Sequence, residues 1–153
     1  MNSPNLVTVQ GKLRGNATYQ VTVRGKTSEG YSSIGSYSFV TNLPPRGGIC
    51  KAHKRQGKAW ETNFVIRCIG WQDDNLPLKF QFSYNSSDGI EMIFQSGHSS
   101  TAKGKLPVGD PNMDYKLDVR VLVIDALGSS VDFWTYLKVS VILGLSLFSS
   151  FLA

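Results

Sequence analysis

The sequence predicts an all-β fold, an antiparallel β-sandwich. Alternation of apolar and polar residues is the dominant pattern, and no internal stretch has the spacing of an amphipathic helix. Clusters of glycine, proline and serine separate the alternating runs, as turns separate strands. With 153 residues, 41% of them hydrophobic, the chain can bury one ordinary core, or one module of about 100 residues and part of a second.

The first alternating run covers residues 18–24. Its apolar face carries Tyr19, Val21 and Val23, and its polar face carries Gln20, Thr22 and Arg24. This pattern is typical of a sandwich strand with one face exposed to water. Gly30 and the pair Ser32-Ser33 indicate a turn, after which residues 36–40 form a second extended segment.

Residues 42–48 contain two prolines and two glycines and are the best candidate for a domain boundary. Residues 1–41 would then be the C-terminal part of a truncated module, with only its last three strands or so. Residues 42–133 would be a complete β-sandwich module, and residues 134–153 an apolar tail of uncertain status.

Three further runs alternate within the proposed complete module. Residues 64–69 and 78–84 each place apolar side chains on one face, which predicts two central strands over a core. Residues 115–123 form the clearest strand in the chain, and residues 125–128 supply a turn at its end.

Two of these strands begin alike. Leu13 precedes Tyr19 and Leu106 precedes Tyr115, in each case with a turn between the two residues. In sandwich domains this arrangement suits a tyrosine corner, in which the hydroxyl bonds a backbone group upstream. Two corners would mean two modules. The alternative is that both are ordinary strand tyrosines, since tyrosine favours strands.

The chain has two cysteines, Cys50 and Cys68, and two glycosylation sequons, at Asn16 and Asn85. Together they indicate an oxidising, secretory environment and one disulfide. The alternative is a pair of free buried thiols in a chain whose sequons arose by chance. No signal peptide opens the sequence, which we interpret as the sign of a fragment.

Two sequence pieces carry a family resemblance. The first is Pro-Pro-x-Gly-Gly-x-Cys at residues 44–50, and the second is Cys-x-Gly-Trp-x-Asp at residues 68–73. With Leu-Pro-Val-Gly at 106–109 and residues 119–128, they make residues 42–131 resemble the REJ module, named after the receptor for egg jelly and found in the ectodomains of polycystin-like proteins. Residues 6–41 are similar to the closing half of a fibronectin type III repeat.

The resemblance implies fibronectin type III-like or Ig-like sandwich modules on the extracellular side of the plasma membrane. It also implies a structural, adhesive or ligand-sensing part of a membrane receptor associated with calcium-channel activity. The expected partners are neighbouring modules of a larger ectodomain, an extracellular protein or glycan ligand, and the membrane, through parent segments or the tail. The alternative is a self-contained glycan-binding module, secreted or anchored to the membrane.

No residue pattern predicts catalysis or a cofactor, because the chain has no nucleophile elbow, phosphate loop, dinucleotide fingerprint or paired histidine motif. We expect neither an enzyme nor a nucleic-acid-binding protein. His53 and His98 have no neighbours at a zinc-ligand spacing. Aspartates near strand ends are weak calcium candidates, with turn capping as the preferred alternative: Asp73, Asp74 and Asp125, and beyond them Asp110 and Asp114.

Positive charge is most concentrated at residues 51–58, in a chain of formal net charge +5. The segment contains Lys51, His53, Lys54, Arg55 and Lys58. It could hold a sulfated glycan or an acidic partner. The preferred alternative is that these charges discourage aggregation at an edge strand.

Residues 139–153 are apolar apart from small serine and glycine residues. They are fewer than the roughly twenty residues that span a bilayer, unless residues 134–137 lengthen the segment. Three interpretations stay open: a membrane anchor, a lipid-anchor signal with the small residues 128–130 upstream, or a truncated or mispredicted sequence. The last is preferred.

Overall fold

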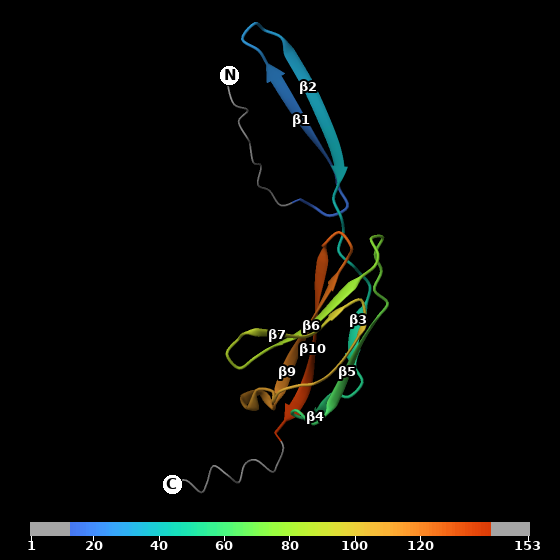
Figure 1. The fold of residues 1–153 in the computed structure, drawn as a ribbon, viewed down its shortest axis with the longest axis vertical. Coiled ribbons are helices and arrows are strands. Elements are labelled where there is room, and N and C mark those ends of the chain that lie inside the picture. Colours follow the sequence, from blue (N-terminus) through green and yellow to red (C-terminus); the bar gives the residue numbers. More distant parts are fainter. Residues whose placement is uncertain (1–12, 142–153) are drawn as a thin grey trace. The chain divides into compact units, whose positions relative to one another are not determined.

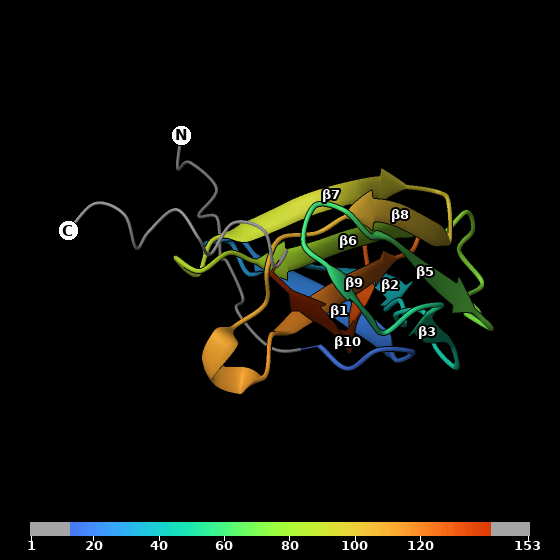
Figure 2. The same cartoon turned by 90° about the horizontal axis from the view of Figure 1, so that it is seen from below.

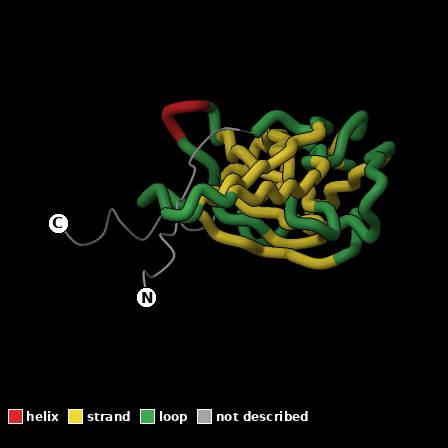
Figure 3. The backbone as a smooth tube through the Cα atoms, turned by 90° about the horizontal axis from the view of Figure 1, so that it is seen from above, coloured by secondary structure: helices red, strands yellow, loops and turns green. Residues whose placement is uncertain are grey.

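The structure is a computed structural model and describes residues 13–141 (Figure 1). It is all-β, and the only helical segment within those residues is one short 3-10 turn, η1 (Pro111–Met113), drawn in red in Figure 3. The chain divides into two compact units, Met1–Leu43 and Pro44–Ala153.

The described part of the first unit is a β-hairpin. Strands β1 (Thr18–Lys26) and β2 (Ser32–Val40) pair antiparallel along their whole length, with Tyr19 opposite Phe39 and Val21 opposite Tyr37. The predicted turn is shorter than expected, because Ser32 and Ser33 already belong to β2. The Thr27 hydroxyl closes this turn by accepting a hydrogen bond from the Tyr31 backbone N–H at 3.1 Å.

The cross-strand register makes the hairpin two-faced, as the alternation predicts. One face carries Tyr19, Val21, Val23, Tyr37 and Phe39, and the rings of Tyr19 and Phe39 stack with their centroids 5.7 Å apart. Most of this face is exposed, with Val23 66% and Tyr37 70% accessible. Within the described residues of this unit, no second sheet covers it.

A tyrosine corner is present at the first of the two predicted positions. The Tyr19 hydroxyl accepts a hydrogen bond from the backbone N–H of Arg14, 2.8 Å away and five residues upstream. At the second position, Tyr115 has a left-handed backbone (φ 58°) just before β9. Within residues 13–141 its hydroxyl has no upstream backbone partner, so the second corner is not formed.

The second unit is a β-sandwich of two sheets (Figures 1 and 2). The larger sheet has the order β4-β10-β9-β6-β7 and the smaller has the order β3-β5-β8. Their strands are β3 (Ile49–Ala52), β4 (Gln56–Lys58), β5 (Asn63–Ile69), β6 (Lys79–Asn85), β7 (Glu91–Gly97), β8 (Thr101–Lys105), β9 (Lys116–Ile124) and β10 (Ser130–Ser140).

The core lies between these sheets and follows from the period of two in the strands. The large apolar side chains most fully removed from water are Phe64, Ile66, Phe82, Leu106, Val119, Val121, Val123, Leu137 and Val139. Full burial of one such side chain stabilises the fold by about 1.5–3 kcal/mol. The predicted central strands β5 and β6 are therefore confirmed, and they lie in opposite sheets.

The predicted start of the apolar tail at residue 134 is wrong. It falls inside β10, where Leu137 and Val139 are fully buried and alternate with Lys138 and Ser140. The apolar residues that follow in the sequence hide this alternation. Residues 142–153, the rest of the predicted tail, lie outside the described residues, and within residues 13–141 no helix is long and apolar enough to cross a bilayer.

Candidate functional site

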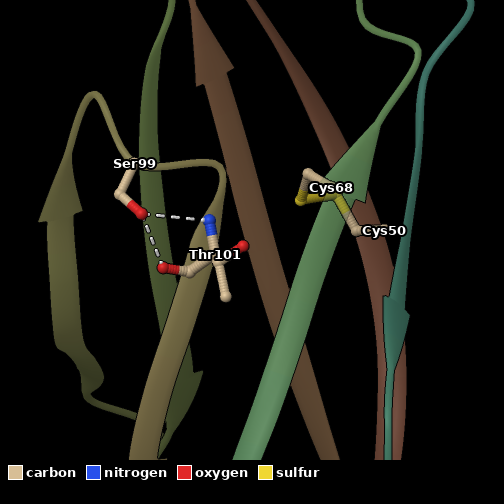
Figure 4. Close-up of a disulfide and its surroundings, with 4 residues drawn as sticks. All are labelled: Cys50, Cys68, Ser99 and Thr101. Atoms are coloured by element: carbon tan, nitrogen blue, oxygen red, sulfur yellow. Dashed lines mark hydrogen bonds between the residues drawn. A yellow bond between two sulfur atoms is a disulfide. The ribbon is translucent and has the colours of Figure 1, made fainter.

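The predicted disulfide between Cys50 and Cys68 is present (Figure 4). The two cysteines lie directly opposite each other on the antiparallel strands β3 and β5, with their Cα atoms 4.0 Å apart. Both side chains are buried in the core. The disulfide therefore joins neighbouring strands of the smaller sheet and does not join the two sheets.

The glycine and tryptophan next to the two cysteines contact each other. A Cβ atom at Gly48 would lie 2.2 Å from the ring of Trp71, so only glycine fits there. The Trp71 ring packs edge-on against Phe133, with the ring centroids 6.3 Å apart. Arg46 and Gln72 exchange two backbone hydrogen bonds of 3.0 Å and continue the β3–β5 pairing. These motif residues thus have a structural role.

The aspartates proposed as weak calcium candidates divide between two ends of the sandwich. Asp125 follows β9, and the Ala126 N–H bonds the carbonyl of Asn75, so the turn at Asp125 lies beside the loop of Asp73 and Asp74. The backbone of Asp110 instead forms an isolated β-bridge with that of Lys116, at the start of β9.

The carboxylates of this group bond backbone or cationic groups. Asp125 accepts hydrogen bonds from the N–H groups of Leu127 and Ser129, at 2.8 and 2.9 Å. Asp73 accepts one from Asn75 at 2.7 Å, and Asp110 accepts one from Asn112 at 2.8 Å. Asp114 pairs with Lys138, whereas Asp74 is exposed. The bonds of Asp73, Asp110 and Asp125 are those of turn-capping residues.

The histidines are separated, as their positions suggested. His53 is exposed beside β3, whereas His98 Nδ1 lies 2.9 Å from the carbonyl oxygen of Leu78. Across residues 13–141, no three or more His, Cys, Asp or Glu side chains gather closely enough to hold a metal ion.

Both glycosylation sequons lie on accessible turns. Asn16 is exposed in the turn before β1, and Asn85 is exposed at the end of β6. Asn85 also lies at a hollow of about 340 Å³ lined by residues 85–87, 108–111 and 116–118. An oligosaccharyltransferase needs an accessible asparagine, and these two positions meet that requirement.

The basic segment 51–58 does not form one patch. Lys51 projects from the outer face of β3, away from the neighbouring buried Cys50. Arg55 lies with its guanidinium carbon 5.9 Å from the centre of the Tyr136 ring, and Lys58 Nζ donates to the carbonyl of Val141 at 3.3 Å. Lys54 is exposed in the loop between β3 and β4.

The structure places two cationic residues that are distant in sequence, Arg67 and Lys103, near Lys51 and His53. A hollow of about 560 Å³ on the smaller sheet is lined by Lys51, Ala52, His53, Val65, Arg67 and Lys103. Arg67 and Lys103 were not among the predicted site residues. The exposed alternate positions of 63–69 indicated an outer face, but the pairing that brings β8 next to β5 had no local sequence signal.

A charged network crosses the outer face of the larger sheet. Arg120 pairs with Asp132 at 2.5 Å and with Glu91 at 2.9 Å, and the Ser83 hydroxyl donates to Glu91 at 2.6 Å. The hydrogen bond from Ser83, followed by that from Arg120, lowers the pKa of Glu91 below its ordinary value. Its bonds to Asp132 and Glu91 raise the pKa of Arg120.

Comparison with known proteins supplies the family. The REJ domain family matches residues 1–146, a longer stretch than the residues 42–131 that carry the sequence resemblance. A mouse protein named polycystin family receptor for egg jelly is 28% identical over 116 residues, which cover 68% of this chain and 6% of the relative. The human protein of that name is 26% identical over 112 residues, covering 65% of this chain and 5% of the relative.

The chain thus spans about one twentieth of the length of these relatives, which are large receptors. The matched family is not a known catalytic family. Since the family match covers almost the whole chain, the protein belongs to the REJ domain family.

Proposed function

We propose that this chain is a non-catalytic module of the extracellular part of a polycystin-like membrane receptor, where it links neighbouring modules and presents binding surfaces. The observation that carries the proposal is the family match over residues 1–146, shared with relatives named as receptors. The buried Cys50–Cys68 disulfide supports it, because disulfides form and persist in oxidising compartments.

The hairpin supports a role among neighbouring modules. The hairpin is amphipathic, as a strand pair of a sandwich is, yet Val23 and Tyr37 on its apolar face are mostly exposed. A two-stranded hairpin alone is marginally stable in water and needs a further layer. Completion of this module by further chain, as the likeness of residues 6–41 to a closing fibronectin type III half implies, would cover this face.

Glycosylation at Asn16 and Asn85 follows from the proposed location. Both asparagines are exposed at turns, and neither is part of the core. A glycan at Asn85 would lie at the rim of the hollow formed with residues 108–111. Receptor function in calcium-channel signalling would belong to the longer parent protein.

The test is surface labelling of the parent protein in its own cells. A peptide tag inserted between Ser87 and Asp88, in the exposed β6–β7 turn, should be labelled by antibody on intact cells. Digestion with an N-glycosidase should shift the mass of the protein, and Asn16→Gln with Asn85→Gln should remove the part of that shift due to this module. Labelling only after permeabilisation, with no glycosidase shift, would overturn the proposal.

A further inference from the structure

The hollow of about 340 Å³ beside Asn85 has two walls from distant parts of the chain. One wall is residues 85–87, at the end of β6 and in the turn that follows it. The other is residues 108–111 together with the start of β9. Asn85 is itself a lining residue, it is exposed, and Ser87 completes its sequon. The asparagine that would carry a glycan therefore opens directly onto the hollow.

Hydrogen bonds hold both walls in place. In the first wall, the Ser86 N–H donates to the carbonyl of Ile90 at 2.8 Å, and the Ser86 hydroxyl accepts from the Ile90 N–H at 3.2 Å. In the second, the Gly109 N–H donates to the carbonyl of Val139 at 2.9 Å. A Cβ atom at Gly109 would collide with the carbonyl of Tyr115, so only glycine fits there. A ligand in the hollow meets walls that are already ordered, which lowers the entropic cost of binding.

The lining combines apolar and polar surface. Val108 is 42% exposed, and Pro111 is exposed in η1, so both present apolar surface outside the core. Lys116 and Asp118 form an ion pair of 2.9 Å at the start of β9. A pyranose ring has the same two parts, a face of C–H groups and a rim of polar groups. The volume of the hollow lies near the lower end of the range of about 300–1,000 Å³ typical of ligand pockets, which suits a single sugar unit.

We infer that the first N-acetylglucosamine of a glycan on Asn85 occupies this hollow and stabilises the sandwich. This inference rests on the proposed extracellular function and gives one of its two glycans a structural role. The C–H face of the sugar packs on Val108 and Pro111, and its polar groups face the ion pair at the start of β9. Asn16 lies in the hairpin unit and lines neither of the hollows described above, so its glycan has no such role.

Covalent attachment makes weak contacts sufficient. A group held by a short tether has an effective concentration of the order of millimolar at a site within its reach. The sugar on Asn85 starts at the wall of the hollow, so it needs little affinity of its own to stay there. The unfolded chain carries the same sugar without the hollow. Contacts made only in the folded chain therefore stabilise it.

The test uses the 153-residue chain, secreted from mammalian cells behind a signal peptide with its glycans kept in the high-mannose form. Thr18→Ala, at an exposed position of β1, removes the Asn16 sequon and leaves that of Asn85. Tryptophan fluorescence follows melting of the sandwich, since all three tryptophans lie in the second unit.

Three forms of this chain are compared. The first keeps the whole glycan on Asn85, the second is trimmed by endoglycosidase H to one sugar, and the third lacks the sugar because Ser87→Ala removes the sequon. The first two should melt within about 1 °C of each other, and the third should melt about 3 °C lower or more. A loss on trimming to one sugar would assign the effect to the outer sugars, and equal melting of all three forms would leave the sugar without a role. Either result overturns the inference.

Two controls separate the sugar from the serine side chain. Ser87→Thr keeps the sequon and should keep the melting temperature of the parent chain. Ser87→Ala in chains made with glycosylation blocked should shift the melting temperature by less than about 1 °C. An equal loss from Ser87→Ala in glycosylated and sugar-free chains would show a local effect of the hydroxyl, which contradicts the inference.

A second measurement tests the hollow itself. Val108→Ala should lower the melting temperature more in the chain with the sugar than in the sugar-free chain, because the sugar loses a contact. Leu127→Ala removes an exposed apolar side chain beyond the opposite end of β9 and should act equally in both chains. If the effect of Val108→Ala is independent of the sugar, the sugar does not occupy the hollow.

Failure of this inference differs from failure of the proposed function. Mass spectrometry that finds Asn85 without sugar in the secreted chain overturns the inference, while antibody labelling of the tagged parent on intact cells still supports the proposed function. Labelling only after permeabilisation overturns both.

Discussion

The β1–β2 hairpin and the sandwich that begins at Pro44 use the same alternating pattern with opposite results. In β9, Val119, Val121 and Val123 are completely removed from water. In the hairpin, Val23 and Tyr37 alternate with polar residues just as regularly, yet they are mostly exposed. The difference teaches that alternation determines which face of a strand is apolar, whereas burial requires a second layer.

The two regions also differ in the contacts that stabilise them. The sandwich has a disulfide between β3 and β5 and a glycine contact with Trp71. The hairpin has the Tyr19 hydroxyl bond to Arg14 and stacked rings on an open face. Since all three tryptophans, at 60, 71 and 134, lie in the second unit, tryptophan fluorescence monitors unfolding of the sandwich alone.

The largest expected effect comes from removal of a core ring. Phe82→Ala should lower the free energy of unfolding of the sandwich by about 3–5 kcal/mol, because it leaves a cavity between the sheets. Tyr37→Ala in the hairpin should change it by less than about 0.5 kcal/mol. Urea unfolding followed by tryptophan fluorescence measures both. Equal losses would show that hairpin and sandwich unfold as one unit.

Loss of the disulfide should rank second. Cys50→Ala/Cys68→Ala should cost about 2–4 kcal/mol, since the two cysteines, 18 positions apart in sequence, no longer restrict the unfolded chain. The same urea experiment applies. A reductant should weaken the parent chain to a similar degree and leave the double variant unaffected; a parent chain insensitive to reductant would contradict the prediction.

A methyl group added at Gly48 should have a smaller effect. Gly48→Ala should cost about 1–3 kcal/mol, because the new Cβ collides with the Trp71 ring. Gly35→Ala in the hairpin is the matched control, since a Cβ there meets no atom within 4 Å. Combination of Gly48→Ala with Trp71→Ala should cost less than the sum of the two single changes. Strict additivity would rule out the collision as the cause.

The smallest effect concerns acid stability. The pKa of Glu91 is lower in the folded chain than in the unfolded chain, so the ionised carboxylate stabilises the fold above the unfolded pKa. That contribution is lost as the pH falls through the lower, folded pKa. Glu91→Gln should therefore flatten the decline of the melting temperature below about pH 5. Glu29→Gln, in the hairpin turn, should leave the decline unchanged.

Much of the fold could be predicted from local patterns. Residues 18–24, 36–40, 64–69, 78–84 and 115–123 were predicted as extended, and strands occupy these regions, apart from Leu78 and Tyr115, which precede β6 and β9. Strands β3, β4, β7 and β8 had no such signal. Three of them have only three to five residues, too few for the alternation to be distinct, and β7 is largely exposed. Strand β10 was not predicted either, because the apolar sequence that continues beyond its end hides its alternation.

The sequence by itself determined the all-β class, the apolar face of each long strand and the expectation of one disulfide between the two cysteines. These features depend on neighbouring residues and on residue type. Only the tertiary structure decided that β5 lies between β3 and β8, which brings Arg67 and Lys103 next to Lys51 around one hollow of the smaller sheet. It also decided that the face of β9 is buried whereas that of β1 is exposed. The physical reason is that pairing and layering join residues far apart in the chain, and no local period specifies which partners meet.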